Sequence, residues 1–175
     1  MSEIEFNSNY IKNGLYAGLA CVLIYFVSHT FDPGFYIKQS KLFGGLILIL
    51  FLIKSCKDEL IALGGFASFG ELLKASFITY LIAAFIISIF TYILYNFINP
   101  NLARIELDIT MEIMEKALDW VGAPDDVLEE VETELDKVDY QKDFFTVLTD
   151  FISKLFSGII LSLIISAVYK KNRTA

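Results

Sequence analysis

The stretch ASFITYLIAAFIISIFTYILYNFI (Ala75 to Ile98) contains 24 residues without a charged side chain. As an α-helix it would extend about 36 Å, which is enough to cross the hydrocarbon core of a bilayer with some tilt. A backbone surrounded by lipid must satisfy its own hydrogen bonds, so a span of this kind has to be helical. The stretch therefore predicts an integral membrane protein.

Three further apolar runs predict three more spans. Asn13 to Phe31 has no formally charged residue over 19 positions, which is close to the length that a spanning helix needs. Leu42 to Ile53 has only 12 residues, so its helix must begin near Tyr36, with neighbouring lysines extended toward the headgroups. Leu155 to Tyr169 has 15 residues, and its helix must begin near Phe144. The predicted fold class is all-α, with four transmembrane helices.

Residues 99–143, between the third and fourth spans, are strongly acidic. Residues 101–145 carry fourteen carboxylates against four basic side chains, within a chain whose net charge is −7. A helix is predicted to begin at Asn99 and Pro100, and Gly122 to Pro124 should end it and start a second one. Residues 1–175 are thus expected to form a single integral membrane domain that contains a non-cytoplasmic acidic helical hairpin.

The first helix of this hairpin has two apolar flanks. With 100° per residue, Leu102, Ile105, Ile109, Ile113 and Trp120 share one flank, and Leu107, Met111, Met114, Leu118 and Val121 share the other. A helix that is apolar on two sides is normally covered on both. The second helix would cover one flank, and the membrane surface, an outer loop of this chain or another chain would cover the other. The interaction candidates are Ile105, Ile109, Ile113, Met114, Leu118 and Trp120.

The loop between the second and third spans includes GGFASFGELLKASF (Gly64 to Phe77). Gly64 and Gly65 are expected to end one helix, and Ser68 with Glu71 three residues later matches a capping box at the start of the next. The charges in this stretch are therefore interpreted as marking the membrane boundary.

Four spans place both termini on the same side of the membrane. If that side is cytoplasmic, the inner segments carry seven basic residues in 39 positions, and the outer segments carry six in 55. Because cytoplasmic loops are enriched in Lys and Arg, this distribution predicts that both termini are cytoplasmic.

Three ionisable residues near the outer ends of spans are the intramembrane polar candidates: His29, Asp150 and Lys154. Such groups are functional candidates by default. Asp150 and Lys154 are four residues apart with the acid first, so a local ion pair near the interface would explain both. For His29, a headgroup or packing role is expected. The alternative is a cleft around these three side chains that serves a channel or carrier.

The sequence predicts no catalytic, cofactor-binding or metal-binding residue. The stripe Asp108, Glu112, Glu115 and Asp119 could face a divalent cation, but no His or Cys accompanies it, and a solvated acidic face is expected. We find no phosphate-binding loop, nucleophile elbow or zinc-ligand spacing, so an enzyme is not expected. The acidic insert would repel nucleic acid.

Several motifs carry a resemblance. NGLYAG (Asn13 to Gly18), GGFASFGELLKASF, and YNFINP (Tyr95 to Pro100) followed by an acidic helical insert resemble a Bacteroidota family that is catalogued as domain of unknown function 4199. The resemblance extends from about Lys12 to Lys171. It implies a four-span protein of the bacterial inner membrane and brings no activity, ligand or functional residue.

Two functional hypotheses follow. The first is a non-enzymatic interaction or accessory subunit that contacts a protein partner, or a second copy of itself, through the acidic hairpin. The second is a small channel or carrier for an ion or small solute. The lipid bilayer is the one partner that both hypotheses require.

Overall fold

The computed structural model describes residues 9–122, 127, 130–131, 133–134 and 142–171. The described part is helical, in the order α1 (Asn9–Phe31), α2 (Pro33–Phe35), the π-helix η1 (Tyr36–Ser40), α3 (Lys41–Ala62), α4 (Phe69–Ile93), the π-helix η2 (Leu94–Ile98), α5 (Leu102–Val121) and α7 (Phe144–Tyr169). The all-α fold class is therefore confirmed.

Four of these helical segments are long and apolar enough to span a membrane, as predicted. The short second run gains its length from α2 and η1, which lead directly into α3, so the helical segment extends from Pro33 to Ala62. The fourth span begins at Phe144. Its N-cap is Asp143, whose Oδ1 accepts a hydrogen bond of 2.7 Å from the Thr146 backbone amide. This hydrogen bond lowers the pKa of the Asp143 carboxyl.

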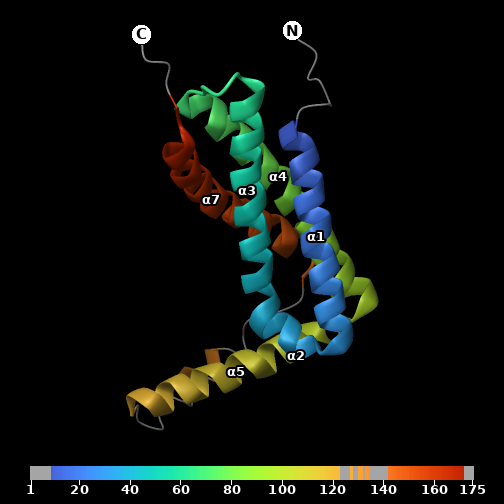
Figure 1. Ribbon diagram of the computed structural model, residues 1–175. Coiled ribbons are helices and arrows are strands. Elements are labelled where there is room, and N and C mark those ends of the chain that lie inside the picture. Colours follow the sequence, from blue (N-terminus) through green and yellow to red (C-terminus); the bar gives the residue numbers. More distant parts are fainter. Residues whose placement is uncertain (1–8, 123–126, 128–129, 132, 135–141, 172–175) are drawn as a thin grey trace.

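The helix α4 is the centre of the bundle and packs against α1, α3 and α7. On α1, Gly14 and Gly18 face α4, where a Cβ on Gly18 would lie 2.9 Å from the Cβ of Ile86. These two glycines therefore let two helices of the same chain approach closely. α7 crosses the bundle obliquely, and the described ends of α1 and α7 nearest the termini lie at the same end of the molecule (Figure 1).

The loop between α3 and α4 follows the prediction. Gly64 and Gly65 have φ angles of +75° and +88°, which L-residues with side chains rarely adopt. Ser68 caps α4: its Oγ accepts a hydrogen bond from the Glu71 amide, and Glu71 Oε2 accepts one from the Ser68 amide at 2.7 Å. The capping box is confirmed.

The start of α5 differs from the prediction. The Asn99 amide donates to the Leu94 carbonyl oxygen at 2.8 Å, so Asn99 closes the π-helical turn of η2 instead of capping the next helix. A turn at residues 99–101 follows, and α5 begins at Leu102. The predicted end is confirmed, because Gly122 adopts a φ of +67°. Most of the predicted second helix of the hairpin lies outside the described residues.

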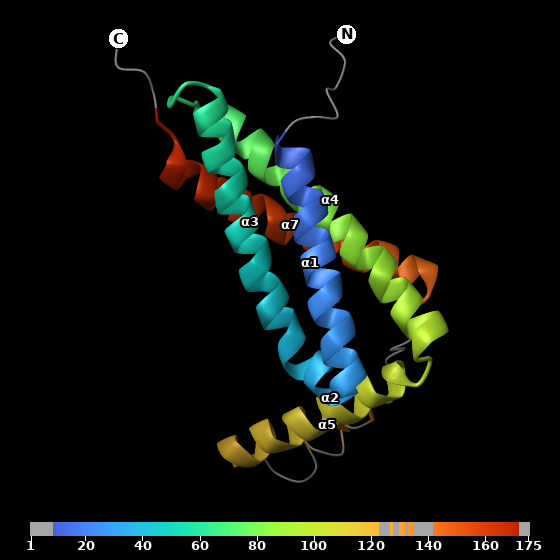
Figure 2. The ribbon, with the colours of Figure 1, turned by 45° about the vertical axis from the view of Figure 1, so that its right-hand side comes forward.

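α5 lies crosswise to the spans, at the end of the bundle opposite the chain termini (Figures 1 and 2). Its first half contacts α2 and η1, and Leu102, Glu106 and Ile109 are buried there. The connection between α1 and α3, formed by α2 and η1, therefore covers the first part of one apolar flank.

Candidate functional site

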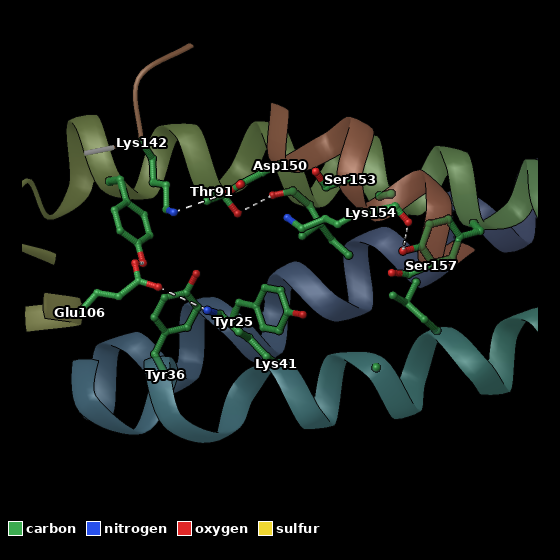
Figure 3. A pocket seen from close by; sticks show the side chains of 16 residues that line it. Tyr25, Tyr36, Lys41, Thr91, Glu106, Lys142, Asp150, Ser153, Lys154 and Ser157 are labelled. Carbon is green, nitrogen blue, oxygen red and sulfur yellow. Dashed lines mark hydrogen bonds and ion pairs between the residues drawn. The ribbon is translucent and has the colours of Figure 1, made fainter. Parts of the chain in front are cut away.

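A cavity of about 570 Å³ lies in the half of the bundle next to α5. α3, α4 and α7 form most of its wall, and single residues from α1, η1, η2, α5 and the segment before α7 complete it (Figure 3). Four tyrosines, three lysines and two carboxylates line it: Tyr25, Tyr36, Tyr80, Tyr95, Lys41, Lys142, Lys154, Glu106 and Asp150. The volume is in the range of small-molecule sites.

Small residues leave the space open. Gly45, Ala84, Ser153 and Ser157 line the cavity, and a Cβ on Gly45 would find nothing within 4 Å. In the other half of the bundle, the fully buried Leu52, Cys56 and Leu72 belong to a continuous apolar cluster. The cavity therefore lies in the half of the bundle toward α5, beside a second apolar cluster that includes Tyr25, Leu94 and Leu102.

Glu106 is the most deeply buried carboxylate of the cavity wall, with a side chain that is 11% exposed. It reaches the cavity from α5, outside the spans. Its Oε2 accepts a hydrogen bond of 2.6 Å from the Tyr95 hydroxyl, and its Oε1 lies 3.3 Å from the Lys41 Nζ. A buried carboxylate needs such partners to remain charged. Glu106 thus joins α5, α3 and η2 at the cavity.

The second ion pair joins Lys142 to Asp150. Lys142 Nζ lies 3.5 Å from Asp150 Oδ2 and also lies over the ring of Tyr95, 6.0 Å from its centroid. Lys142 precedes α7 in the chain and belongs to no helix, yet its side chain is largely buried, with 18% exposed. The sequence hypothesis paired Asp150 with Lys154, whereas in the structure Asp150 forms its ion pair with Lys142 and interacts with Lys154 only at longer range.

Lys154 is the third cation of the cavity. It is half-buried on α7, and its ammonium makes no hydrogen bond or ion pair with the part of the chain that the structure describes. Its backbone carbonyl accepts a 2.9 Å hydrogen bond from the Tyr80 hydroxyl, which holds α7 against α4. Figure 3 shows the Lys154 side chain beside Asp150, on the wall opposite Lys41.

The formal charge of the cavity follows from these contacts. Each carboxylate forms an ion pair with one lysine. Lys154 adds a third positive charge that forms no ion pair of its own among the described residues and interacts with the already paired Asp150 only at longer range. An ammonium shielded from water is costly unless an anion or several hydrogen-bond acceptors face it. The site can therefore accept one anionic group without leaving a charge uncompensated.

The structure brings two of the three intramembrane polar candidates together. Asp150 and Lys154 both line the cavity, whereas His29 does not belong to the lining set. The His29 Nε2 lies 3.1 Å from the Asn99 Nδ2, and its ring packs edge-on against Tyr36 at 6.1 Å. These contacts fit the expected packing role of His29.

The six interaction candidates on α5 separate by burial. Ile109 is buried, Ile105 and Leu118 are half-buried, and Ile113, Met114 and Trp120 are exposed. In the acidic stripe, Glu112 accepts hydrogen bonds from Lys116 at 2.5 Å and from Lys38 at 3.0 Å. These two ammonium groups lower the pKa of the Glu112 carboxyl to about 2, so it stays ionised in an ion-pair network.

Sequence reasoning missed Lys41, Glu106, Lys142 and the four tyrosines as parts of one site. Lys41 is one of the lysines next to the short second run that the sequence assigns to the headgroups, and Glu106 is one of the fourteen carboxylates of the acidic insert. One available signal was the position of Glu106 between Leu102 and Ile109, on the apolar flank of α5. A carboxylate there is a candidate for a buried hydrogen-bonded group.

A family model described as "Protein of unknown function (DUF4199)" matches residues 12–171, so the chain belongs to this family. Neither a curated protein nor a solved structure matches the chain. The match agrees with the resemblance found in the sequence and brings no ligand or activity with it.

Proposed function

We propose that this DUF4199 protein is a non-enzymatic membrane protein that binds a small anionic molecule in the cavity beside α5. The anionic group, a carboxylate or a phosphate, would lie against Lys154, and the tyrosine hydroxyls would donate hydrogen bonds to it. The observation that carries the proposal is the surplus cation: three lysines and two carboxylates line the cavity, and only Lys154 lacks an ion pair among the described residues.

The position of the cavity fits a ligand that enters from the α5 side of the membrane. Lys41, whose side chain is well exposed, marks that side, and the apolar cluster around Leu52 and Leu72 closes the opposite half. The ligand could be a lipid headgroup that enters between helices or a water-soluble anion. Both present the same chemistry to Lys154.

The direct test is native mass spectrometry of the full-length protein extracted from membranes in a mild detergent. We expect the wild type to carry a bound species that is released as an anion, and the Lys154→Gln variant to lose it. Lys154→Arg should retain it because it keeps the charge. Lys12→Gln, which removes an exposed lysine from the first turn of α1, should also retain it.

The mass of the released species distinguishes a phospholipid from a small solute. Equal occupancy in the wild type and Lys154→Gln, in samples with the same thermal unfolding temperature, would overturn the proposal. So would the release of neutral molecules alone.

A carrier would use the same site to move its ligand across the membrane. In that case, liposomes containing the wild type should take up the anion identified above, and liposomes containing Asp150→Asn should show altered uptake, because Lys142 loses its partner. Binding without uptake would leave a binding protein and exclude the carrier.

An accessory subunit that contacts a protein partner is the second candidate function. The observation that favours it is the exposed apolar surface on the far flank of α5, where Met114 is 42% exposed. A photoreactive amino acid at position 114 should form one discrete protein adduct in membranes, and the same group at position 115 on the acidic stripe should not. A monomeric protein that forms no adduct at either position would contradict this function.

A further inference from the structure

The side of α5 that rests on the bundle continues past the bundle's edge. With 100° per residue, Leu102 and Ile109 lie on the same side of the helix as Ile113 and Trp120. Leu102 and Ile109 are buried against the bundle, whereas Ile113 is 53% exposed and Trp120 is 88% exposed. We call Ile113, Lys116 and Trp120 the distal stripe, since Lys116 lies between the other two on this side.

Among the described residues, the ion pair with the bundle that lies furthest along α5 joins Glu112 to Lys38 of η1. Beyond this point, α5 extends sideways past the beginning of α3 in both views (Figures 1 and 2). The distal stripe therefore has the same orientation as the buried residues, but no spanning helix above it. In a membrane protein, lipid occupies the space beside the spanning helices.

Because α5 lies crosswise to the spans at their ends, its axis runs along the membrane surface. Its bundle-facing side then faces the headgroups of the surrounding lipid. A tryptophan and a lysine next to apolar residues are typical of a helix at this level, since the indole lies among the headgroups and the ammonium reaches the phosphates.

We propose that the distal half of α5 is an interfacial helix, and that Ile113 and Trp120 bind the lipid surface beside the bundle, with Lys116 held at the headgroup level while it stays paired with Glu112. The apolar side chains would enter the boundary between headgroups and acyl chains, which such helices reach to a depth of about 5–10 Å. Asp108, Glu115 and Asp119 lie on an adjacent side of the helix. Their charge disfavours anionic lipids, so apolar burial in a zwitterionic surface should dominate the binding.

The chain provides its own probe, because Trp120 is its single tryptophan. The full-length protein is reconstituted into phosphatidylcholine vesicles, some of which carry bromine atoms on the acyl chains at shallow or deep positions. We expect the Trp120 fluorescence to be quenched strongly by shallow bromines, weakly by deep ones, and little by acrylamide in the water. The emission should change little when salt is added.

Two comparisons distinguish lipid contact from other causes of Trp120 quenching or protection. Ile113→Glu should raise the quenching of Trp120 by acrylamide, and Met114→Glu, at the next position on the other flank, should not. The double variant Trp120→Phe, Leu118→Trp moves the indole to the opposite side of α5. Its fluorescence should be insensitive to bromine.

Full quenching of Trp120 by acrylamide together with no effect of bromine would place the indole in water and overturn the proposal. Protection from both quenchers would also overturn it, because the indole would then be covered by protein, including a second copy of this chain.

Discussion

At the scale of single residues, two serines of α7 differ in one hydrogen bond. Ser162 and Ser166 are both fully buried and lie about one turn apart. Ser166 Oγ lies 3.1 Å from Ser76 Oγ of α4, whereas Ser162 Oγ has no hydrogen-bond partner in the described structure. An unsatisfied buried hydroxyl costs stability, while a hydroxyl pair between membrane helices contributes a modest amount.

We therefore expect different effects from removing these two hydroxyls. Ser166→Ala should lower the free energy of unfolding by about 0.6 kcal/mol, because the hydroxyl contact between α4 and α7 is lost while Ser76 keeps only its bonds to the Leu72 and Leu73 carbonyls. Ser162→Ala should leave the stability unchanged or raise it. Equilibrium unfolding of each variant in mixed micelles measures both. An equal loss for the two variants would mean that the Ser76 contact contributes nothing.

Lys154 shows how far a residue can be interpreted from sequence alone. The spacing of Asp150 and Lys154 correctly identified two ionisable side chains on α7. The partner of Asp150 was not predictable, because Lys142 is close to it only when the segment before α7 turns toward Tyr95. Spacing along one helix describes neighbours on that helix, whereas the charge balance of a cavity depends on several elements.

At the scale of elements, α3 depends on two neighbouring glycines with opposite surroundings. A Cβ on Gly44 would overlap the side chain of Tyr25, which packs edge-on against Tyr36 at 5.9 Å. A Cβ on Gly45 would extend into the open cavity. The first glycine thus permits α1 and α3 to approach, and the second leaves room for a ligand.

The two alanine substitutions should change the free energy of unfolding in opposite directions. Gly44→Ala should lower the free energy of unfolding by about 1–3 kcal/mol through overpacking. Gly45→Ala should raise it by up to about 1 kcal/mol, because alanine is the better helix former and meets no neighbour. Thermal unfolding in detergent ranks both against the wild type. A loss for Gly45→Ala as large as that for Gly44→Ala would contradict the open cavity wall.

The element boundaries show which sequence signals were reliable. Runs without charge located all four spans, and Ser68 with Glu71 marked the start of α4, because both depend on local interactions. The start of α5 was predicted two to three residues early, because Asn99 is used by the π-helical turn of η2. A π-helical turn changes which backbone amide remains without an intrahelical partner, and hydrophobic periodicity in the sequence does not reveal such a turn.

At the scale of the whole molecule, the bundle is asymmetric along its axis. Tyr25, Tyr36 and Tyr95 line a cavity that holds five lysine and carboxylate side chains besides them in one half, and Leu52 and Leu72 fill the other. Composition predicted the membrane, but it did not predict the cavity. The cavity results from the oblique course of α7 and from small residues on three different helices, which no single segment of sequence combines.

Because the cavity lies in only one half of the bundle, the orientation of the protein in the membrane decides from which side a ligand reaches it. The distribution of Lys and Arg predicts that the ends of α1 and α7 nearest the termini are cytoplasmic, so α5 would lie outside. Both native cysteines, Cys21 and Cys56, are fully buried, and the folded wild type should not react with a membrane-impermeant maleimide. Single cysteines can therefore be added without removing the native ones.

In intact spheroplasts, we expect Asp119→Cys on α5 to be labelled by this maleimide, and Lys12→Cys at the start of α1 to be labelled only after the cells are lysed. Both positions are exposed, so the difference in labelling reports the side of the membrane alone. The reverse pattern would show that the cavity faces the cytoplasm and draws its ligand from there. Labelling of both variants in intact spheroplasts would mean that the chain inserts in two orientations, and the bias of seven basic residues against six would then be too small to set the topology.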